Sequence, residues 1–185
     1  LDGTNVVVPS SHIALRTLAF SDQVAFPWFA PAGFQRGLVS NATSVGYVDP
    51  TSGEFTPVTL NEGQRDTLYQ NKVNPIASFP GRGLSVFGQK TLNPSASALD
   101  RINVARLVTY LRERLDDMVK PFIFEPNDEV TRANAKSTVD GFLEQLIIQR
   151  GLFDYITVCD GTNNTPARID RNELYIDIAI QPVKA

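Results

Sequence analysis

The first residues that could carry chemistry lie in the segment Gly83–Thr91, which reads Gly-Leu-Ser-Val-Phe-Gly-Gln-Lys-Thr. It looks like the glycine-rich loop of nucleotide hydrolases, in which lysine directly follows the second glycine so that its ammonium group and the backbone N–H groups face the same phosphates. Here Gln89 separates that glycine from Lys90, and the residues before the glycine favour a strand. We therefore predict a buried strand followed by a turn, with nucleotide handling through Lys90 and Thr91 as the less favoured alternative.

The remaining candidates do not assemble a reaction centre. His12 and Cys159 are the single histidine and the single cysteine, which excludes a disulfide framework and zinc sites built from several such ligands. We expect His12 at the start of a helix and Cys159 as a small buried hydrophobic residue. Asp116 and Asp117 are adjacent in a predicted helix, where neighbours point about 100° apart, so they cannot share a proton. We predict no catalytic residues, no metal, no cofactor and no enzymatic activity.

Composition narrows the class of protein further. The chain has 185 residues, 42% of them hydrophobic and 20% charged, which is enough for one packed domain. A formal net charge of -3 argues against a nucleic-acid partner, because binding to a phosphate backbone needs an excess of basic residues. No charge-free apolar run approaches the roughly 18 residues that cross a bilayer, so we expect no membrane partner. The chain begins without methionine, and we interpret it as a fragment of a larger protein.

Hydrophobic periodicity predicts two long helices in the second half of the chain. The first runs from about Leu99 to Lys120 and ends at Pro121, because proline cannot continue the helical hydrogen bonds. The second begins after Asn127 or Asp128, either of which is a suitable N-cap, and runs to Arg150, with Gly151 as its stop. Shorter helices are predicted over residues 11–23 and 61–69; the second has Asn61 and Gln64 at the spacing of a capping box.

Short strands are predicted between these helices. The expected buried strands are residues 77–79, 84–87 and 155–159, and Asp160 is expected to open the turn that continues through Asn164. The glycine- and proline-rich stretch 26–59 is interpreted as structured loop with one hairpin. Strands and helices intermix, so the predicted fold class is α/β of the α+β type: a mixed β-sheet flanked by helices in a single domain.

The ends of the chain offer strands that could pair with another chain. Near the N-terminus lies a run of valines, and near the C-terminus hydrophobic residues alternate with others, as in a half-buried strand. A terminal strand without a neighbour presents unpaired N–H and C=O groups, which favour pairing with a second chain. We therefore predict inter-subunit strand pairing through Val6, Val7, Val8, Leu174, Ile176, Ile178 and Ile180.

Two stretches in the first part of the chain are specific enough to be compared with known families. Residues 11–22 read Ser-His-Ile-Ala-Leu-Arg-Thr-Leu-Ala-Phe-Ser-Asp, and residues 28–33 read Trp-Phe-Ala-Pro-Ala-Gly. Together they resemble the opening of the conserved C-terminal domain of contractile tail sheath proteins of bacteriophages. The order continues with Val-Asn-Pro-Ile at 73–76 and Gly-Gln-Lys-Thr-Leu at 88–92. Arg-Ile-Asn-Val-Ala-Arg at 101–106 and Phe-Ile-Phe-Glu-Pro-Asn-Asp at 122–128 also fall in family order. The resemblance spans roughly residues 8–183.

The resemblance implies a mechanical function. Sheath subunits of this family form hexameric rings stacked helically around an inner tube. Their contraction drives the tube through the bacterial envelope during genome ejection. Terminal arms of neighbouring subunits add strands to the sheet of this domain, a mode called β-augmentation. The implied partners are other copies of the chain, the inner tail tube protein, and the baseplate and tail terminator proteins. The implied location is the virion tail, with assembly in the host cytoplasm.

This chain also departs from the family pattern. Family members continue past the Ile-Gln-Pro-Val ending at 180–183 into a further apolar arm, and they carry N-terminal and outer domains. We therefore expect the chain by itself to be monomeric. A sheath of a related contractile system, of bacteriocin or secretion type, stays an open alternative within the same family.

Overall fold

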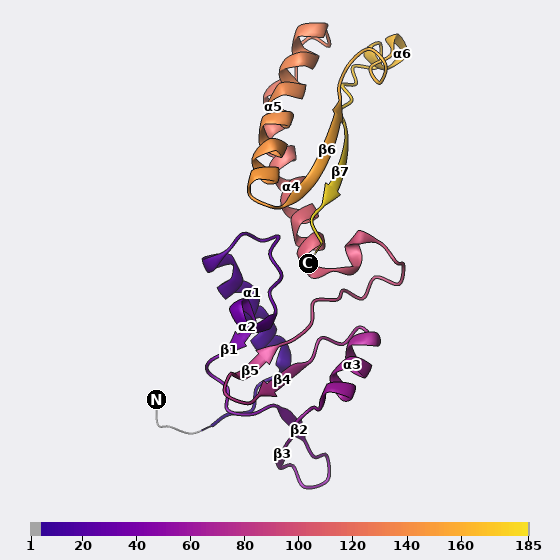
Figure 1. Ribbon diagram of the computed structural model, residues 1–185. Coiled ribbons are helices and arrows are strands. Elements are labelled where there is room, and N and C mark those ends of the chain that lie inside the picture. The colour runs from indigo at the N-terminus through magenta and orange to yellow at the C-terminus, as the bar shows by residue number, and fades with distance from the viewer. Residues whose placement is uncertain (1–4, 185) are drawn as a thin grey trace. The chain divides into compact units, whose positions relative to one another are not determined.

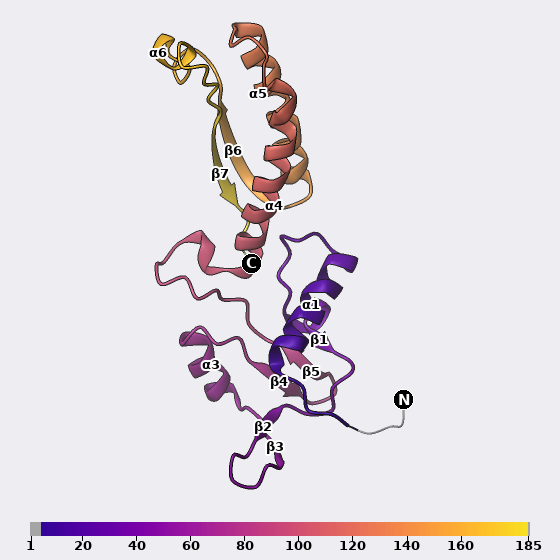
Figure 2. The ribbon, with the colours of Figure 1, turned by 180° about the vertical axis from the view of Figure 1, so that it is seen from behind.

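The computed structural model describes residues 5–184, whose elements are drawn in Figure 1 and, from behind, in Figure 2. Its contacts divide the chain after Ala105 into two compact units. Helices and strands intermix, as predicted. The strands form three small sheets of antiparallel pairs where we expected one sheet of mixed strand directions. The expectation of a single domain stays a prediction.

The first unit is built around a three-stranded sheet of order β1-β5-β4. Helices α1 and α2 contact β1, and α2 also contacts β5. Ile13 of α1 packs with Val39, Leu84 and Val86 of the sheet in a buried hydrophobic cluster. The elements are α1 (Ser10–Val24), α2 (Gly33–Arg36), β1 (Leu38–Val39), β4 (Ile76–Phe79) and β5 (Gly83–Val86).

The rest of this unit confirms several local predictions. The expected hairpin is β2 (Gly46–Val48) paired with β3 (Phe55–Pro57). Helix α3 (Glu62–Gln70) begins with the predicted capping box, since the Asn61 side chain accepts from the N–H of Gln64 and the Gln64 side chain accepts from the N–H of Asn61. A short 3-10 helix, η1 (Ala98–Asp100), leads into α4 (Ile102–Val119).

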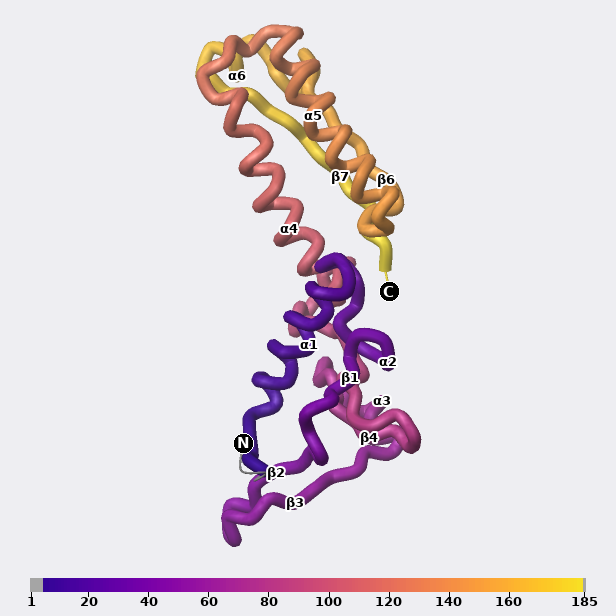
Figure 3. The backbone as a smooth tube through the Cα atoms, turned by 90° about the vertical axis from the view of Figure 1, so that its left-hand side faces the viewer, coloured from indigo at the N-terminus to yellow at the C-terminus, as the bar shows by residue number. Residues whose placement is uncertain are grey.

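The second unit packs helix α5 (Glu129–Ile148) against a two-stranded sheet of β6 (Leu152–Val158) and β7 (Asp177–Pro182). Figure 3 shows α4 and α5 running in opposite directions. They are joined through η2 (Lys120–Phe122), in which Pro121 ends the α-helical hydrogen bonding as expected. Val139, Leu143 and Leu146 of α5 are fully buried, as is Leu152 of β6.

The two ends of α5 differ in how well the sequence predicts them. Asp128 is the N-cap, and its carboxylate accepts from the N–H of Thr131 at 2.8 Å, as predicted. At the other end, Arg150 takes the left-handed conformation with φ of 63°. The N–H of Gly151 then bonds to the carbonyl of Leu146, so the helix ends in a Schellman motif with arginine at the position usually held by glycine.

Candidate functional site

The β6–β7 hairpin is the candidate site because both of its outer edges carry backbone groups that no strand of the described residues covers. The two strands run antiparallel, with Tyr155 opposite Ile180 and Ile156 opposite Ala179. A β-bulge interrupts the register between Leu152 and Asp154. In Figure 1 the hairpin lies alongside α5, which covers one of its faces.

One hydrogen bond fixes which backbone groups point inward. The N–H of Val183 donates to the carbonyl of Gly151 at 3.1 Å, so Val183 faces β6. Because successive residues of a strand point their backbone groups to opposite sides, Ala179 and Gln181 also face β6. Ile178 and Ile180 therefore direct their N–H and C=O groups toward the outer edge of β7. Pro182 shares this outward position, where a residue without an N–H loses no bond within the hairpin.

Two of the predicted pairing residues thus stand at an open edge. Ile178 and Ile180 belong to β7 and are half-buried, with side chains on the face toward α5. Tyr155 identifies that face, because it lies opposite Ile180 and opposite residues share a face of the sheet. The Tyr155 hydroxyl lies 3.3 Å from the carbonyl of Asp140 and 3.3 Å from a carboxylate oxygen of Glu144, both in α5. Burial raises the pKa of Tyr155, and the nearby carboxylates raise it further.

Leu174 and Ile176 precede the strand, which begins only at Asp177. The reason is a pair of buried asparagines in the loop after β6. The side-chain oxygen of Asn164 accepts from the N–H of Tyr175 at 2.7 Å, and its amide group donates to the Tyr175 carbonyl at 2.9 Å. These bonds hold the backbone at Tyr175 against the loop, so the strand pairing to β6 starts two residues later.

Asn163 completes this arrangement, which we call the asparagine lock (Asn163 and Asn164). Its amide donates to the carbonyl of Val158 at 2.8 Å and to the Asp177 carboxylate at 2.9 Å, so it joins the end of β6 to the start of β7. Asp160 opens the turn, as expected, and the hydroxyl and N–H of Thr162 lower the pKa of its carboxyl. The residue types at 160–164 predict a turn, but they do not reveal the lock, because its bonds to Tyr175 and Asp177 reach a segment more than ten residues away.

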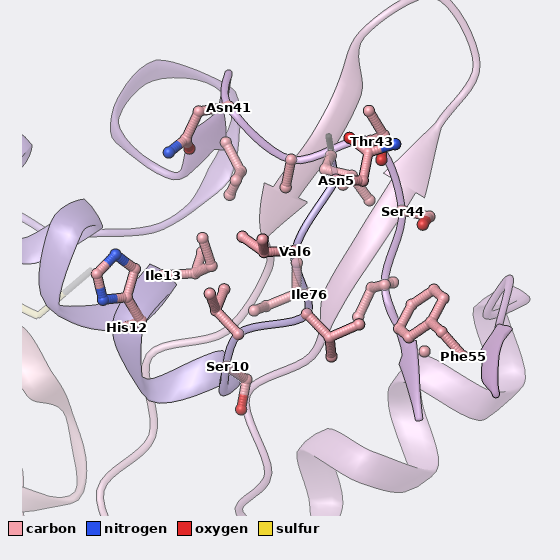
Figure 4. A pocket seen from close by; sticks show the side chains of 17 residues that line it. Asn5, Val6, Ser10, His12, Ile13, Asn41, Thr43, Ser44, Phe55 and Ile76 are labelled. Atoms are coloured by element: carbon pink, nitrogen blue, oxygen red, sulfur yellow. The ribbon is translucent and has the colours of Figure 1, made fainter. Parts of the chain in front are cut away.

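Val6, Val7 and Val8 form no strand and are exposed. They line an open pocket of about 580 Å³ in the first unit. Figure 4 shows Val6, Ile13 and Ile76 near its centre, with Asn41 and Ser44 farther out. These valines are not part of the β6–β7 sheet, and their pairing with a second chain stays a prediction.

The phosphate-loop alternative finds no support in the geometry. Gly83–Val86 is a strand, as expected, and the loop after it is held by Asn74, whose side chain accepts from the N–H of Lys90 at 2.8 Å and donates to its carbonyl at 2.9 Å. The Lys90 ammonium donates to the carbonyl of Tyr69 at 2.9 Å and lies 4.2 Å from the centre of the Tyr69 ring. This lysine is therefore engaged with its own chain.

The other chemically capable residues lie where the sequence placed them. His12 is exposed in the first turn of α1, and Cys159 is buried, which raises the pKa of its thiol. Asp116 and Asp117 are exposed and both pair with Lys120. Within residues 5–184, no group of three or more His, Cys, Asp or Glu residues could hold a metal ion.

Among the helices within residues 5–184, none is long and apolar enough to cross a membrane.

Comparisons with known proteins agree with this architecture. Residues 95–185 match the family described as phage tail sheath C-terminal domain. The chain is 40% identical over 167 residues to the tail sheath protein of Vibrio phage KVP40, covering 90% of this chain and 23% of that protein. It is 34% identical to the tail sheath protein of Enterobacteria phage T4, again covering 90% of this chain and 24% of the relative. The chain thus spans about a quarter of the length of these relatives.

A solved structure shares the fold. The contracted helical sheath of the anti-feeding prophage superimposes with a TM-score of 0.80 at 22% identity, covering 97% of this chain and 48% of that one. The family match, together with the identities to the two curated relatives, shows that residues 95–185 belong to the family of phage tail sheath C-terminal domains.

Proposed function

We propose that this chain is the C-terminal part of a contractile tail sheath subunit. Copies polymerise helically around the inner tail tube, and their contraction drives the tube through the host cell envelope during genome delivery. The observation that carries the proposal is the identity of 40% and 34% to two phage tail sheath proteins over 90% of the chain. The work is mechanical, and no enzymatic step is needed.

Strand addition at the β6–β7 hairpin suits such a machine. An extended arm of a neighbouring copy that pairs with Ile178 and Ile180 gains main-chain hydrogen bonds, each contributing about 0.5 to 1.5 kcal/mol net. Such bonds depend little on side chains, so they persist while other contacts between subunits change. The free energy of contraction then comes from different subunit contacts in two lattice states, multiplied over many copies.

The partners follow from this function. The chain binds other copies of itself in stacked hexameric rings, the inner tail tube, and the baseplate and terminator proteins at the two ends. It resides in the virion tail after assembly in the host cytoplasm.

A related contractile injection system is the second candidate. The likeness of fold to the anti-feeding prophage sheath supports it, because that particle shares the architecture. The higher sequence identity to phage sheaths favours the phage. Genes for a capsid and for genome packaging beside the sheath gene would decide for the phage, and their absence would decide for the injection system.

Electron microscopy of the complete sheath polypeptide tests the proposal. The protein is produced with and without its tube protein and imaged in negative stain. Hollow striated cylinders are the expected result. Folded but dispersed particles in both preparations would contradict a sheath function.

A further inference from the structure

The two outer edges of the β6–β7 hairpin differ in how freely their backbone groups can pair with another strand. On β7, the backbone groups of Ile178 and Ile180 point outward. On β6, Thr157 lies opposite Ile178 and Tyr155 lies opposite Ile180. In an antiparallel pair the backbone groups of two opposite residues both point inward or both point outward, so the N–H and C=O groups of Thr157 and Tyr155 also point outward. An incoming extended segment could in principle pair along either edge.

On the β6 edge, a side chain of the same strand already occupies an outward backbone N–H group. The outward N–H of Tyr155 donates to the carboxylate oxygen Oδ1 of Asp154 at 2.8 Å. Asp154 is exposed and lies at the β-bulge, where the irregular backbone places its carboxylate beside the next N–H group. A strand that arrived at this edge would have to displace the carboxylate and remove its charge from water.

The surroundings explain why such closure matters. Phe153 and Ile156 lie on the same strand with 70% and 64% of their surface exposed. An edge that combines free backbone groups with exposed apolar side chains is a template for indiscriminate pairing between chains. On β7 the corresponding neighbours are small or polar, Ala179 and Gln181, and the edge ends at Pro182, which has no N–H to offer.

We propose that Asp154 is an edge guard: it keeps extended segments of a second copy off the β6 edge, so that strand addition takes place first at the Ile178–Ile180 edge of β7. The proposal rests on the proposed function for the kind of partner. The guard itself is a property of the hairpin and can be measured without a tube or a sheath.

The test uses this chain with Asp154→Ala, Asp154→Asn and Asp170→Ala. Asn keeps a side-chain oxygen that accepts the Tyr155 N–H, whereas Ala does not. Asp170 is an exposed carboxylate in the segment that connects β6 to β7 and belongs to neither strand, so its replacement removes the same charge away from the strand edges. At low protein concentration, hydrogen exchange of the Tyr155 amide should be about 2- to 10-fold faster in Asp154→Ala than in the parent chain.

At high concentration the same variant should self-associate more than the other two in sedimentation velocity. The association should then slow the exchange of the Tyr155 and Thr157 amides, which face the newly opened edge. The proposal would be overturned if Asp154→Ala associated no more than Asp170→Ala. It would also be overturned if association slowed exchange only at amides other than those of Tyr155 and Thr157. Failure of the complete polypeptide to form cylinders would instead count against the sheath function and leave this measurement intact.

Discussion

Phe124 combines an unfavourable backbone conformation with an exposed aromatic side chain. Its φ is 74°, in the left-handed region that favours glycine, and its side chain is fully exposed. The side chain therefore gains no packing within the chain that would offset the strain. We expect Phe124→Gly to raise the free energy of unfolding of this chain by about 0.5 to 1 kcal/mol, because glycine adopts this conformation without a clash. Urea denaturation measures the change.

Phe124→Ala is the matched control. Alanine removes the same aromatic ring but keeps the Cβ atom that causes the strain. Its stability should stay near that of the parent chain. Equal stabilisation by alanine and glycine would show that loss of the exposed ring, and not relief of the backbone, is responsible.

Asp128 makes the stability of the chain depend on pH at the start of α5. The N–H of Thr131 lowers the pKa of its carboxyl below the ordinary value of 3.8. The folded state therefore prefers the charged form, and the stabilisation is complete above 3.8 and lost as pH falls through the lower folded value. In Asp128→Asn this contribution to the acid limb of the stability curve should disappear.

Thermal unfolding midpoints from neutral pH to well below 3.8 test this, compared as the difference between parent and Asp128→Asn. Other carboxyls with lowered pKa, such as Asp160 and Glu173, titrate in both proteins and cancel in that difference. Parallel curves for the two proteins would contradict the role of the cap.

At the scale of elements, the asparagine lock decides where β7 begins. Asn164 is 2% exposed, and its replacement by alanine leaves the N–H of Tyr175 without its partner. We expect Asn164→Ala to cost about 1 to 3 kcal/mol, the usual penalty for a buried group that loses its hydrogen bond. Hydrogen exchange at Ala179, which donates into the hairpin, should accelerate with it.

Asn134→Ala is the control for this variant, because Asn134 is exposed on α5. It should change neither stability nor exchange at Ala179. If Asn164→Ala destabilised the chain but left exchange in β7 unchanged, the lock would support the loop alone and not the strand.

The elements that sequence predicts best are those fixed by neighbours in the chain. The capping box at Asn61, the cap at Asp128 and the stop at Pro121 each act over a few residues, so spacing alone reveals them. Alternation likewise placed Ile178 and Ile180 correctly in a strand. The start of that strand could not be predicted, because it depends on bonds made by the asparagine lock across the loop.

The same limit applies to the candidate site. Asp154 lies beside an outward N–H because of the bulge and the register of the two strands. A single sequence specifies neither of these features. The exposure of one face of β6, with Phe153 and Ile156 uncovered, was not expected either. The apolar run at residues 155–159 predicts a buried strand, because composition cannot distinguish burial within the chain from burial against a second copy.

At the scale of the whole molecule, the decisive question is whether the β7 edge joins subunits. Ile180 directs its N–H outward, so Ile180→Pro removes a donor at the edge while leaving the bonds between β6 and β7 in place. Ile180→Ala keeps the N–H while it also removes the isoleucine side chain from this half-buried position. In the complete sheath polypeptide we expect both variants to fold with similar thermal midpoints, and only Ile180→Ala to form cylinders.

Ala179→Pro separates this effect from simple damage to the hairpin. Ala179 faces β6, opposite Ile156, so proline there removes a bond within the sheet and should lower the thermal midpoint of the subunit itself. Each lost edge bond is small, about 0.5 to 1.5 kcal/mol, but every subunit of a polymer loses it, so assembly responds steeply. Cylinders of normal length from folded Ile180→Pro protein would show that subunits are joined elsewhere, because a strand paired along β7 needs the N–H that this variant lacks.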